Sequence, residues 1–183
     1  IARNLAVLRA ASPTTIQMAI VKANAYGHGL IPVSLASLKA GAQWLGVAQL
    51  AEALELRAGL DEAGIARKDA PIFAWISATG ADFTAAIEAD IDLSVSWTWV
   101  LDEICAAARA MGRPARVHVK IDTGMSRAGS TLADLPELAQ ALREAQDQGL
   151  IEVVGAWSHM SRADDPSPSG EESTRSHVKI FEE

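Results

Sequence analysis

The sequence predicts an α/β fold, namely a TIM-type (β/α)8 barrel that is here truncated to about six βα units. Short apolar runs alternate with amphipathic helical stretches six times along the chain. Parallel strands need crossover connections, which such helices provide. A doubly wound sheet fits the same alternation, but no GxGxxG turn follows the first apolar run. Six units are too few for a closed eight-stranded barrel, which typically takes about 250 residues.

The first half of the chain contributes three strands and the helices between them. Apolar spacing predicts a helix over residues 1–10, which Ser12-Pro13 ends. Later helices end at glycines suited to the position after a helix, such as Gly41 and Gly59. The expected strands are residues 16–23, 44–47 and 72–76, and the expected helices that follow them are residues 30–40, 51–58 and 83–89.

The second half repeats this pattern. An amphipathic stretch closed by Gly149 is the strongest helical signal, and the Asp-, Ser- and Pro-rich residues 162–169 predict a loop. The expected strands are residues 93–97, 116–121 and 151–157, and the expected helices are residues 100–110, 135–146 and the stretch from Glu171 onward.

Composition restricts the class of protein. With 183 residues, 49% of them hydrophobic and 21% charged, the chain can bury a sizeable core. A net charge of −7 without a basic stripe argues against binding nucleic acid or an anionic membrane. No membrane span or signal peptide is visible, and the single cysteine fits a reducing compartment, so we expect a cytoplasmic protein. That residue, Cys105, is expected to be a small buried hydrophobe on a helix.

Both ends of the chain lie within helical patterns, and the first residue is Ile1 rather than methionine. We therefore expect residues 1–183 to form an incomplete barrel domain that lacks its last strands and any following domain. Exposed sheet edges in such a piece would favour association or aggregation.

The stretch at the end of the first strand carries the clearest chemistry. Residues 19–29 read Ala-Ile-Val-Lys-Ala-Asn-Ala-Tyr-Gly-His-Gly, so Lys22 leaves an apolar run and enters a loop with Tyr26 and His28. Desolvation lowers the pKa of a lysine, and the neutral amine can form a Schiff base with an aldehyde. The local residues alone favour a lysine that only snorkels to the surface, with its stem on apolar neighbours.

Polar residues also gather on and after the fifth strand. Alternation places His118, Lys120 and Asp122 on one face, which is unusual for a strand of a parallel sheet, although a solvated edge strand would explain it. Lys120 and Arg127 repel each other unless an acid, such as Asp122, or a modified lysine lies between them.

Working residues of a parallel α/β fold lie at the carboxyl ends of its strands. Lys22, Lys120, Arg127 and His159 all follow such ends in the predicted fold. Together they predict a positive, partly buried pocket suited to a phosphate or a carboxylate.

Three motifs resemble those of one enzyme family. Residues 21–29 are similar to the cofactor-lysine motif of bacterial alanine racemases, and residues 120–127, Lys-Ile-Asp-Thr-Gly-Met-Ser-Arg, resemble the second motif of that family. Ser158-His159 with Ala163-Asp164 resembles the third. The motifs occur in the order of the family, and the βα rhythm matches over the whole chain.

The resemblance implies a fold-type III enzyme whose N-terminal barrel holds pyridoxal 5'-phosphate, with no metal. Lys22 would match the lysine that binds the cofactor aldehyde and acts as base on one face of the substrate. Tyr26 would match the tyrosine at the cofactor phosphate, and Arg127 the arginine near the phenolic oxygen and the substrate carboxylate. Lys120 would match a lysine that is often carbamylated, and His159 a histidine of the network beside the cofactor ring. His28 is treated as scaffold of its motif.

The same resemblance implies racemisation of L-alanine to D-alanine for peptidoglycan by a homodimer. The second base of the family is a tyrosine from the C-terminal β-domain of the partner subunit, and the only tyrosine here is Tyr26. The chain as given is therefore expected to be inactive or severely impaired. Two alternatives stay open: a single-domain pyridoxal-phosphate-binding protein of cofactor homeostasis without racemase activity, and a non-enzymatic α/β fragment whose charges only face solvent.

Overall fold

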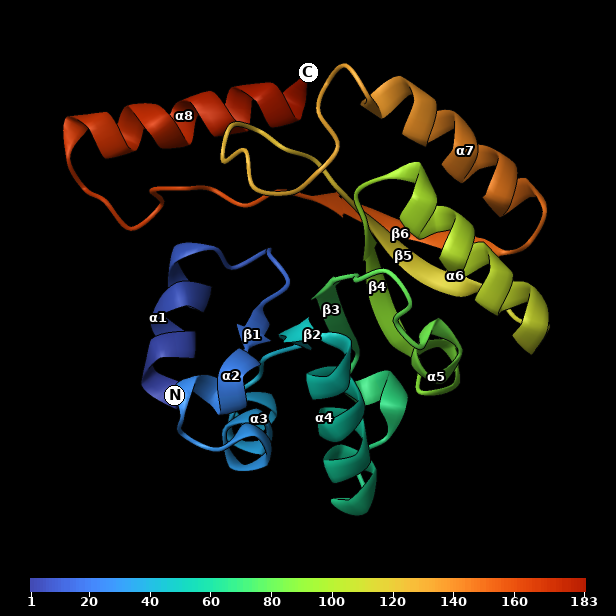
Figure 1. The fold of residues 1–183 in the computed structure, drawn as a ribbon. Helices are drawn as coiled ribbons and strands as arrows, with labels where there is room; N and C mark the ends of the chain where they lie inside the picture. Colours follow the sequence, from blue (N-terminus) through green and yellow to red (C-terminus); the bar gives the residue numbers. More distant parts are fainter. The chain divides into compact units, whose positions relative to one another are not determined.

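The computed structural model describes residues 1–183, in which strands and helices alternate along the chain (Figure 1). The six strands are β1 (Met18–Ile20), β2 (Trp44–Gln49), β3 (Ile72–Ile76), β4 (Ile91–Val95), β5 (Ala115–Lys120) and β6 (Ile151–Trp157). The helices are α1 (Ala2–Ala11), α2 (Lys22–Tyr26), α3 (Leu30–Lys39), α4 (Leu50–Glu62), the 3-10 turn η1 (Arg67–Asp69), α5 (Phe83–Glu88), α6 (Thr98–Met111), α7 (Leu135–Asp147) and α8 (Pro168–Glu182).

The strands follow one another in chain order. β1 pairs with β2, β2 with β3, β3 with β4, and β5 with β6, all in parallel, and the sheet order is β1 to β6 without a reversal. A doubly wound sheet reverses its order at a switch point, whereas the strands of a (β/α)8 barrel run in sequence. The topology therefore favours the barrel over the doubly wound alternative.

The chain divides into two compact units, and the first comprises residues 1–93 and 110–112. Its core joins β2 and β3 to α4, which packs against both strands. Leu45, Val47 and Ile72 from the strands and Leu56 and Leu60 from the helix are fully buried. Burial of such a side chain stabilises the fold by about 1.5–3 kcal/mol.

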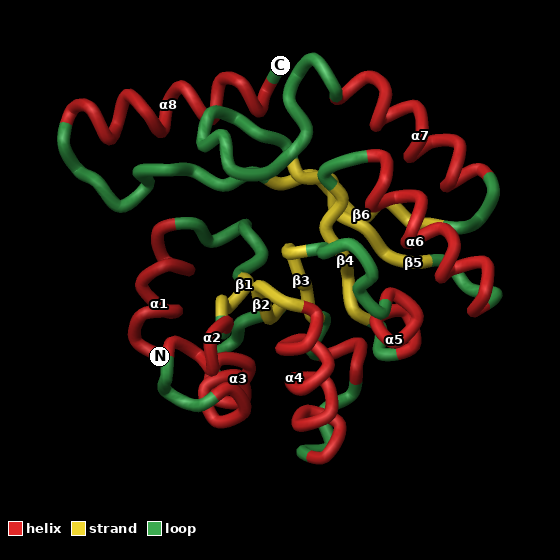
Figure 2. The backbone as a smooth tube through the Cα atoms, in the orientation of Figure 1, coloured by secondary structure: helices red, strands yellow, loops and turns green.

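The second unit comprises residues 94–109 and 113–183. Its helix α7 packs on β6, because Leu138, Leu142 and Ala145 recur at helical spacing and form a buried stripe. Figure 2 shows strands and helices following one another along the chain, mostly through loops, with β2 passing directly into α4. Cys105 is buried in α6 as expected, and burial raises the pKa of its thiol.

Four of the six predicted strands have other bounds in the structure, since β2 ends two residues later than expected and β5 is shifted by one residue, while β1 and β4 differ most. The first was expected over residues 16–23 but β1 ends at Ile20, because the backbone beyond Val21 turns in the left-handed sense. The fourth was expected over residues 93–97 but β4 lies over Ile91–Val95. Asp92 and Ser94 are buried in β4, and these polar residues obscured its start in the sequence. No helix is long and apolar enough to cross a bilayer.

Candidate functional site

Lys22 begins a short turn of unusual handedness. Ala23, Asn24, Ala25 and Tyr26 all have φ between 52° and 54°, the left-handed helical region. For residues other than glycine this conformation costs roughly 1–2 kcal/mol each. Ala25 N donates to Val21 O at 2.8 Å, and the Asn24 side chain accepts from Leu30 N at 2.7 Å where α3 begins. These hydrogen bonds hold the turn in place.

The Lys22 amine lies beside two aromatic rings of the first unit. Its Nζ is 5.9 Å from the ring centroid of Tyr26 and 5.9 Å from that of Trp75, which stands near the end of β3. Distances of this size permit cation–π attraction. Gly46 of β2 leaves room for the indole, since a Cβ there would lie 3.2 Å from Trp75 Cζ3. Lys22 is half-buried and Tyr26 is 61% exposed, so the phenol is open to a ligand.

Lys120 is the last residue of β5 in the second unit and only 5% exposed. Its Nζ lies 3.8 Å from the ring centroid of Trp157, at the end of β6. Burial lowers the pKa of Lys120 to about 8, and the charge of Arg127 adds to this effect while Asp122 opposes it. A substantial share of this amine is therefore neutral in mildly alkaline solution.

The loop that carries Arg127 is closed on itself. Asp122 N donates to Ser130 O, and Ser130 N donates to Lys120 O, both at 2.9 Å, so the two ends of the loop are joined. Gly129 has a φ of +126°, and a Cβ there would lie 2.6 Å from Asp122 N, so only glycine permits this closure.

Asp122 organises the interior of that loop. Its Oδ1 accepts hydrogen bonds from Gly124 N and Ser126 N, both at 3.0 Å. Burial raises the pKa of Asp122, but these hydrogen bonds and the charge of Lys120 outweigh it, and the pKa is lowered. Arg127 is exposed, and its Nη2 lies 3.2 Å from His159 Nδ1. The guanidinium donates in this bond, so His159 Nδ1 is the acceptor.

A chain of hydrogen bonds ties α8 to the same loop. Ser158 Oγ donates to Ile121 O at 2.8 Å, so it accepts from Thr123 Oγ1 at 2.7 Å. Thr123 has then used its only proton and must accept from His177 Nδ1 at 2.7 Å. In the neutral ring Nε2 then accepts a hydrogen bond from Ser161 Oγ at 3.1 Å. His177 is 5% exposed, so this network is a buried anchor of α8.

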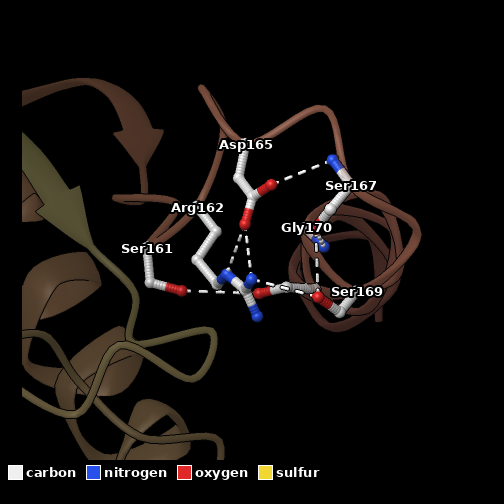
Figure 3. Close-up of polar contacts among 7 residues, drawn as sticks. Ser161, Arg162, Asp165, Ser167, Ser169 and Gly170 are labelled. Atoms are coloured by element: carbon white, nitrogen blue, oxygen red, sulfur yellow. Dashed lines mark hydrogen bonds and ion pairs between the residues drawn. The ribbon is translucent and has the colours of Figure 1, made fainter.

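A second anchor lies at the first turn of α8 (Figure 3). Asp165 accepts from Ser167 N at 2.9 Å and from Arg162 Nε at 3.1 Å, and Arg162 also donates to Ser169 Oγ at 3.0 Å. Ser167 Oγ accepts from Gly170 N at 3.2 Å and so caps the helix. These hydrogen bonds, chiefly the one from Ser167, lower the pKa of Asp165 to about 2.

The structure places Lys120 at the end of a parallel strand, Lys22 and His159 two residues after one, and Tyr26 and Arg127 further along the segments that follow β1 and β5. Lys22 and Tyr26 lie together in the first unit, and Arg127 lies against His159 in the second. Sequence reasoning missed Trp75, Trp157 and His177. The two tryptophans stand near the carboxyl ends of their strands, which is a usable signal, whereas His177 had none. No cluster of His, Cys, Asp and Glu could hold a metal ion.

The sequence matches the family described as "Alanine racemase, N-terminal domain" over residues 1–183. The chain belongs to this family. It is 50% identical over its whole length to an alanine racemase of Beutenbergia cavernae, of which it covers 46%. It is 52% identical over 160 residues, 87% of its length, to an alanine racemase of Frankia casuarinae, of which it covers 39%. The chain thus spans less than half the length of these relatives.

Solved structures of alanine racemases share its fold. That of the enzyme from D-cycloserine-producing Streptomyces lavendulae superposes with a TM-score of 0.89 at 47% identity, over 99% of this chain and 45% of the other. That from Streptomyces coelicolor A3(2) gives a TM-score of 0.91 at 42% identity, over 99% and 46%. The family resemblance and the prediction of a truncated (β/α)8 barrel are confirmed.

Proposed function

We propose that the protein of which this domain is part interconverts L- and D-alanine with pyridoxal 5'-phosphate. The observation that carries the proposal is the match to alanine racemases along all 183 residues, at 50% identity to one of them. The names of these relatives indicate the reaction, and the residues described above indicate how it would be carried out. Residues 1–183 would be the cofactor-binding barrel domain, incomplete without its remaining strands.

Lys22 and Tyr26 of the first unit fit an aldehyde cofactor that carries a phosphate. When bound, pyridoxal phosphate supplies an electron sink for the charge that remains after an α-proton is removed. Lys22 would hold the aldehyde through its amine, and would take and return the α-proton on one face of the substrate. Tyr26, with its exposed phenol, would donate to the phosphate.

Arg127 and His159 would bind and orient the anionic groups. The exposed guanidinium suits the carboxylate of alanine and the phenolic oxygen of the cofactor. Because His159 Nδ1 accepts from Arg127 Nη2 at 3.2 Å, the histidine fixes the direction of the guanidinium. Its ring would complete the hydrogen-bond network beside the cofactor.

Lys120 is proposed to be carbamylated. A buried amine with a pKa of about 8 has a neutral fraction that can attack carbon dioxide. The new C–N bond gives a carbamate, and the nitrogen releases one proton to solvent. The product is an anion, so the repulsion with Arg127 becomes attraction.

Racemisation requires an acid–base group on each face of the substrate. Lys22 would serve one face, and a tyrosine of the partner subunit would serve the other in a homodimer. In a bacterial cytoplasm the product D-alanine would enter peptidoglycan. The domain alone would then be inactive, because it contains one tyrosine, Tyr26, which is already assigned.

The test uses the complete protein, loaded with pyridoxal phosphate and given L-alanine, with D-alanine measured by a D-amino-acid oxidase assay. Borohydride reduction and peptide mapping should place the pyridoxyl group on Lys22. Lys22→Ala should lower kcat about a thousandfold, whereas Lys39→Ala, at an exposed lysine of α3, should leave it unchanged. Cofactor binding without racemisation would instead favour a carrier of the cofactor, and labelling of several lysines would contradict the assigned role.

A further inference from the structure

Building on the proposed function, we infer that Glu52 is a positioning residue that fixes the direction in which Lys22 presents its amine. Glu52 lies in the first turn of α4, far in sequence from the lysine motif. None of the three motifs includes it.

One carboxylate joins three backbone N–H groups from two places in the first unit. Glu52 Oε1 accepts from Ala23 N at 2.6 Å, and Oε2 accepts from Ala48 N and Gln49 N, both at 3.0 Å. The last two bonds lie where β2 ends and α4 begins, and a glutamate in the third helical position commonly makes such bonds. Capping of α4 explains the two hydrogen bonds that Oε2 accepts, but it does not explain the bond from Ala23 N to Oε1.

The bond to Ala23 acts directly on Lys22. The N–H of Ala23 belongs to the peptide unit whose carbonyl is that of Lys22, so holding it fixes the ψ angle of the lysine. Ala23 is also the first of the four left-handed residues, where the backbone is costly to hold. The turn α2 and the helix α4 contact each other, so the link spans a packed region.

The chemistry of this link requires a carboxylate with both oxygens accepting. Glutamine in its place has one carbonyl oxygen and one NH2 group. If the oxygen keeps the cap of α4, the NH2 group faces Ala23 N and two donors oppose each other. Glu52→Gln therefore breaks the link to the lysine turn while the same side chain can still cap the helix.

The first measurement is hydrogen exchange of the Ala23 amide in the complete protein without cofactor. Ala23 is exposed, so in the absence of Glu52 its N–H faces water. We expect exchange at this amide to accelerate at least tenfold in Glu52→Gln. Glu55→Gln is the matched control, because it is the same change one turn further along α4 at an exposed position. It should leave the exchange rate of Ala23 unchanged.

The second measurement follows Lys22 itself. The rate at which added pyridoxal phosphate develops its protein-bound visible absorbance should fall about tenfold in Glu52→Gln and stay constant in Glu55→Gln. In the loaded enzyme kcat should fall about tenfold, while the KM for alanine changes less than twofold, because Arg127 is untouched. Glu52→Asp keeps the charge but shortens the reach, and it should resemble Glu52→Gln; it replaces that variant if the latter does not fold.

The outcomes separate the two proposals. If the wild-type protein neither binds the cofactor at Lys22 nor racemises alanine, the proposed function fails. If it does both, and the Glu52 variants match Glu55→Gln in exchange, binding rate and kcat, Glu52 only caps α4 and the inference is overturned. Faster exchange with an unchanged binding rate and kcat overturns it as well.

Discussion

His177 Nδ1 lies 2.7 Å from Thr123 Oγ1, which connects α8 to the loop that presents Arg127. The protons of Ser158 and Thr123 are already committed along the chain, so the ring must donate through Nδ1. A helix near the end of the chain thereby supports a loop that begins some fifty residues earlier, at Asp122.

His177→Leu should loosen α8, since it removes both ring contacts and leaves the hydroxyl of Ser161 with only its longer contact to Ser173 Oγ, at 3.4 Å. The loss of buried hydrogen bonds should cost about 1–3 kcal/mol. His177→Gln offers one donor and one acceptor and should recover part of it. Thermal unfolding and hydrogen exchange over residues 168–182 measure the effect. Nitrogen-15 chemical shifts of the ring should show a protonated Nδ1. A protonated Nε2 with an unprotonated Nδ1 would refute the assignment of His177 Nδ1 as the donor to Thr123 Oγ1.

Lys120→Met should stabilise the cofactor-free protein in buffer without carbon dioxide. The folded-state pKa of about 8 lies below the ordinary value of 10.5, so the buried cation opposes folding. Below pH 8 the amine is protonated in both the folded and the unfolded state. The destabilisation of the folded state by the buried cation is then complete, at about 3 kcal/mol. Between pH 8 and 10.5 the unfolded state binds more protons, so the stability of the wild type rises with pH.

The measurement is the difference in melting temperature between Lys120→Met and wild type, taken at pH 7 and at pH 10. We expect Lys120→Met to melt at a higher temperature than the wild type at pH 7, and this difference to shrink toward pH 10. The lost contact with Trp157 reduces the difference at both pH values. A difference that is independent of pH would exclude a buried cation as its cause.

Bicarbonate should modify Lys120 in the wild-type protein. Intact mass measured under non-denaturing conditions should increase by one carbon dioxide, and isotope-labelled bicarbonate should give one carbamate signal. Lys120→Met should give neither. The signal should disappear on acidification, because carbamates lose carbon dioxide when protonated. Its persistence in Lys120→Met would assign the carbamate to another amine.

Gly170→Ala should disrupt the first turn of α8. A Cβ at this position would lie 2.2 Å from Asp165 O, and a backbone atom cannot move aside as a flexible side chain does. We expect destabilisation of about 1–3 kcal/mol, typical of overpacking. Gly155→Ala is the control, since its Cβ would meet only His118 Nδ1, at 3.7 Å. Equal melting temperatures for the two variants would contradict the close approach.

The sequence predicted the sheet well, because apolar runs and helical spacing depend on local burial. It predicted Lys22 near the end of a strand over residues 16–23, whereas β1 ends at Ile20. The four residues after Lys22 adopt a left-handed turn that propensity disfavours and that hydrogen bonds from elsewhere stabilise. The position of Arg127 followed from its motif. Periodicity does not reveal contacts between residues that are distant in sequence. Such contacts place Trp75 beside Lys22 and Trp157 beside Lys120, and they join Glu52 to Ala23 and His177 to Thr123.

The order of the strands has a consequence for synthesis of the protein. Each strand pairs with one that the ribosome has just completed, so β1 and β2 can join before the chain beyond them has been translated. Contacts between segments close in sequence form quickly and cost little loop entropy. The domain can therefore assemble stepwise from β1 onward as it emerges, and a pause in translation would leave a part-built sheet whose two exposed edges are β1 and its latest strand.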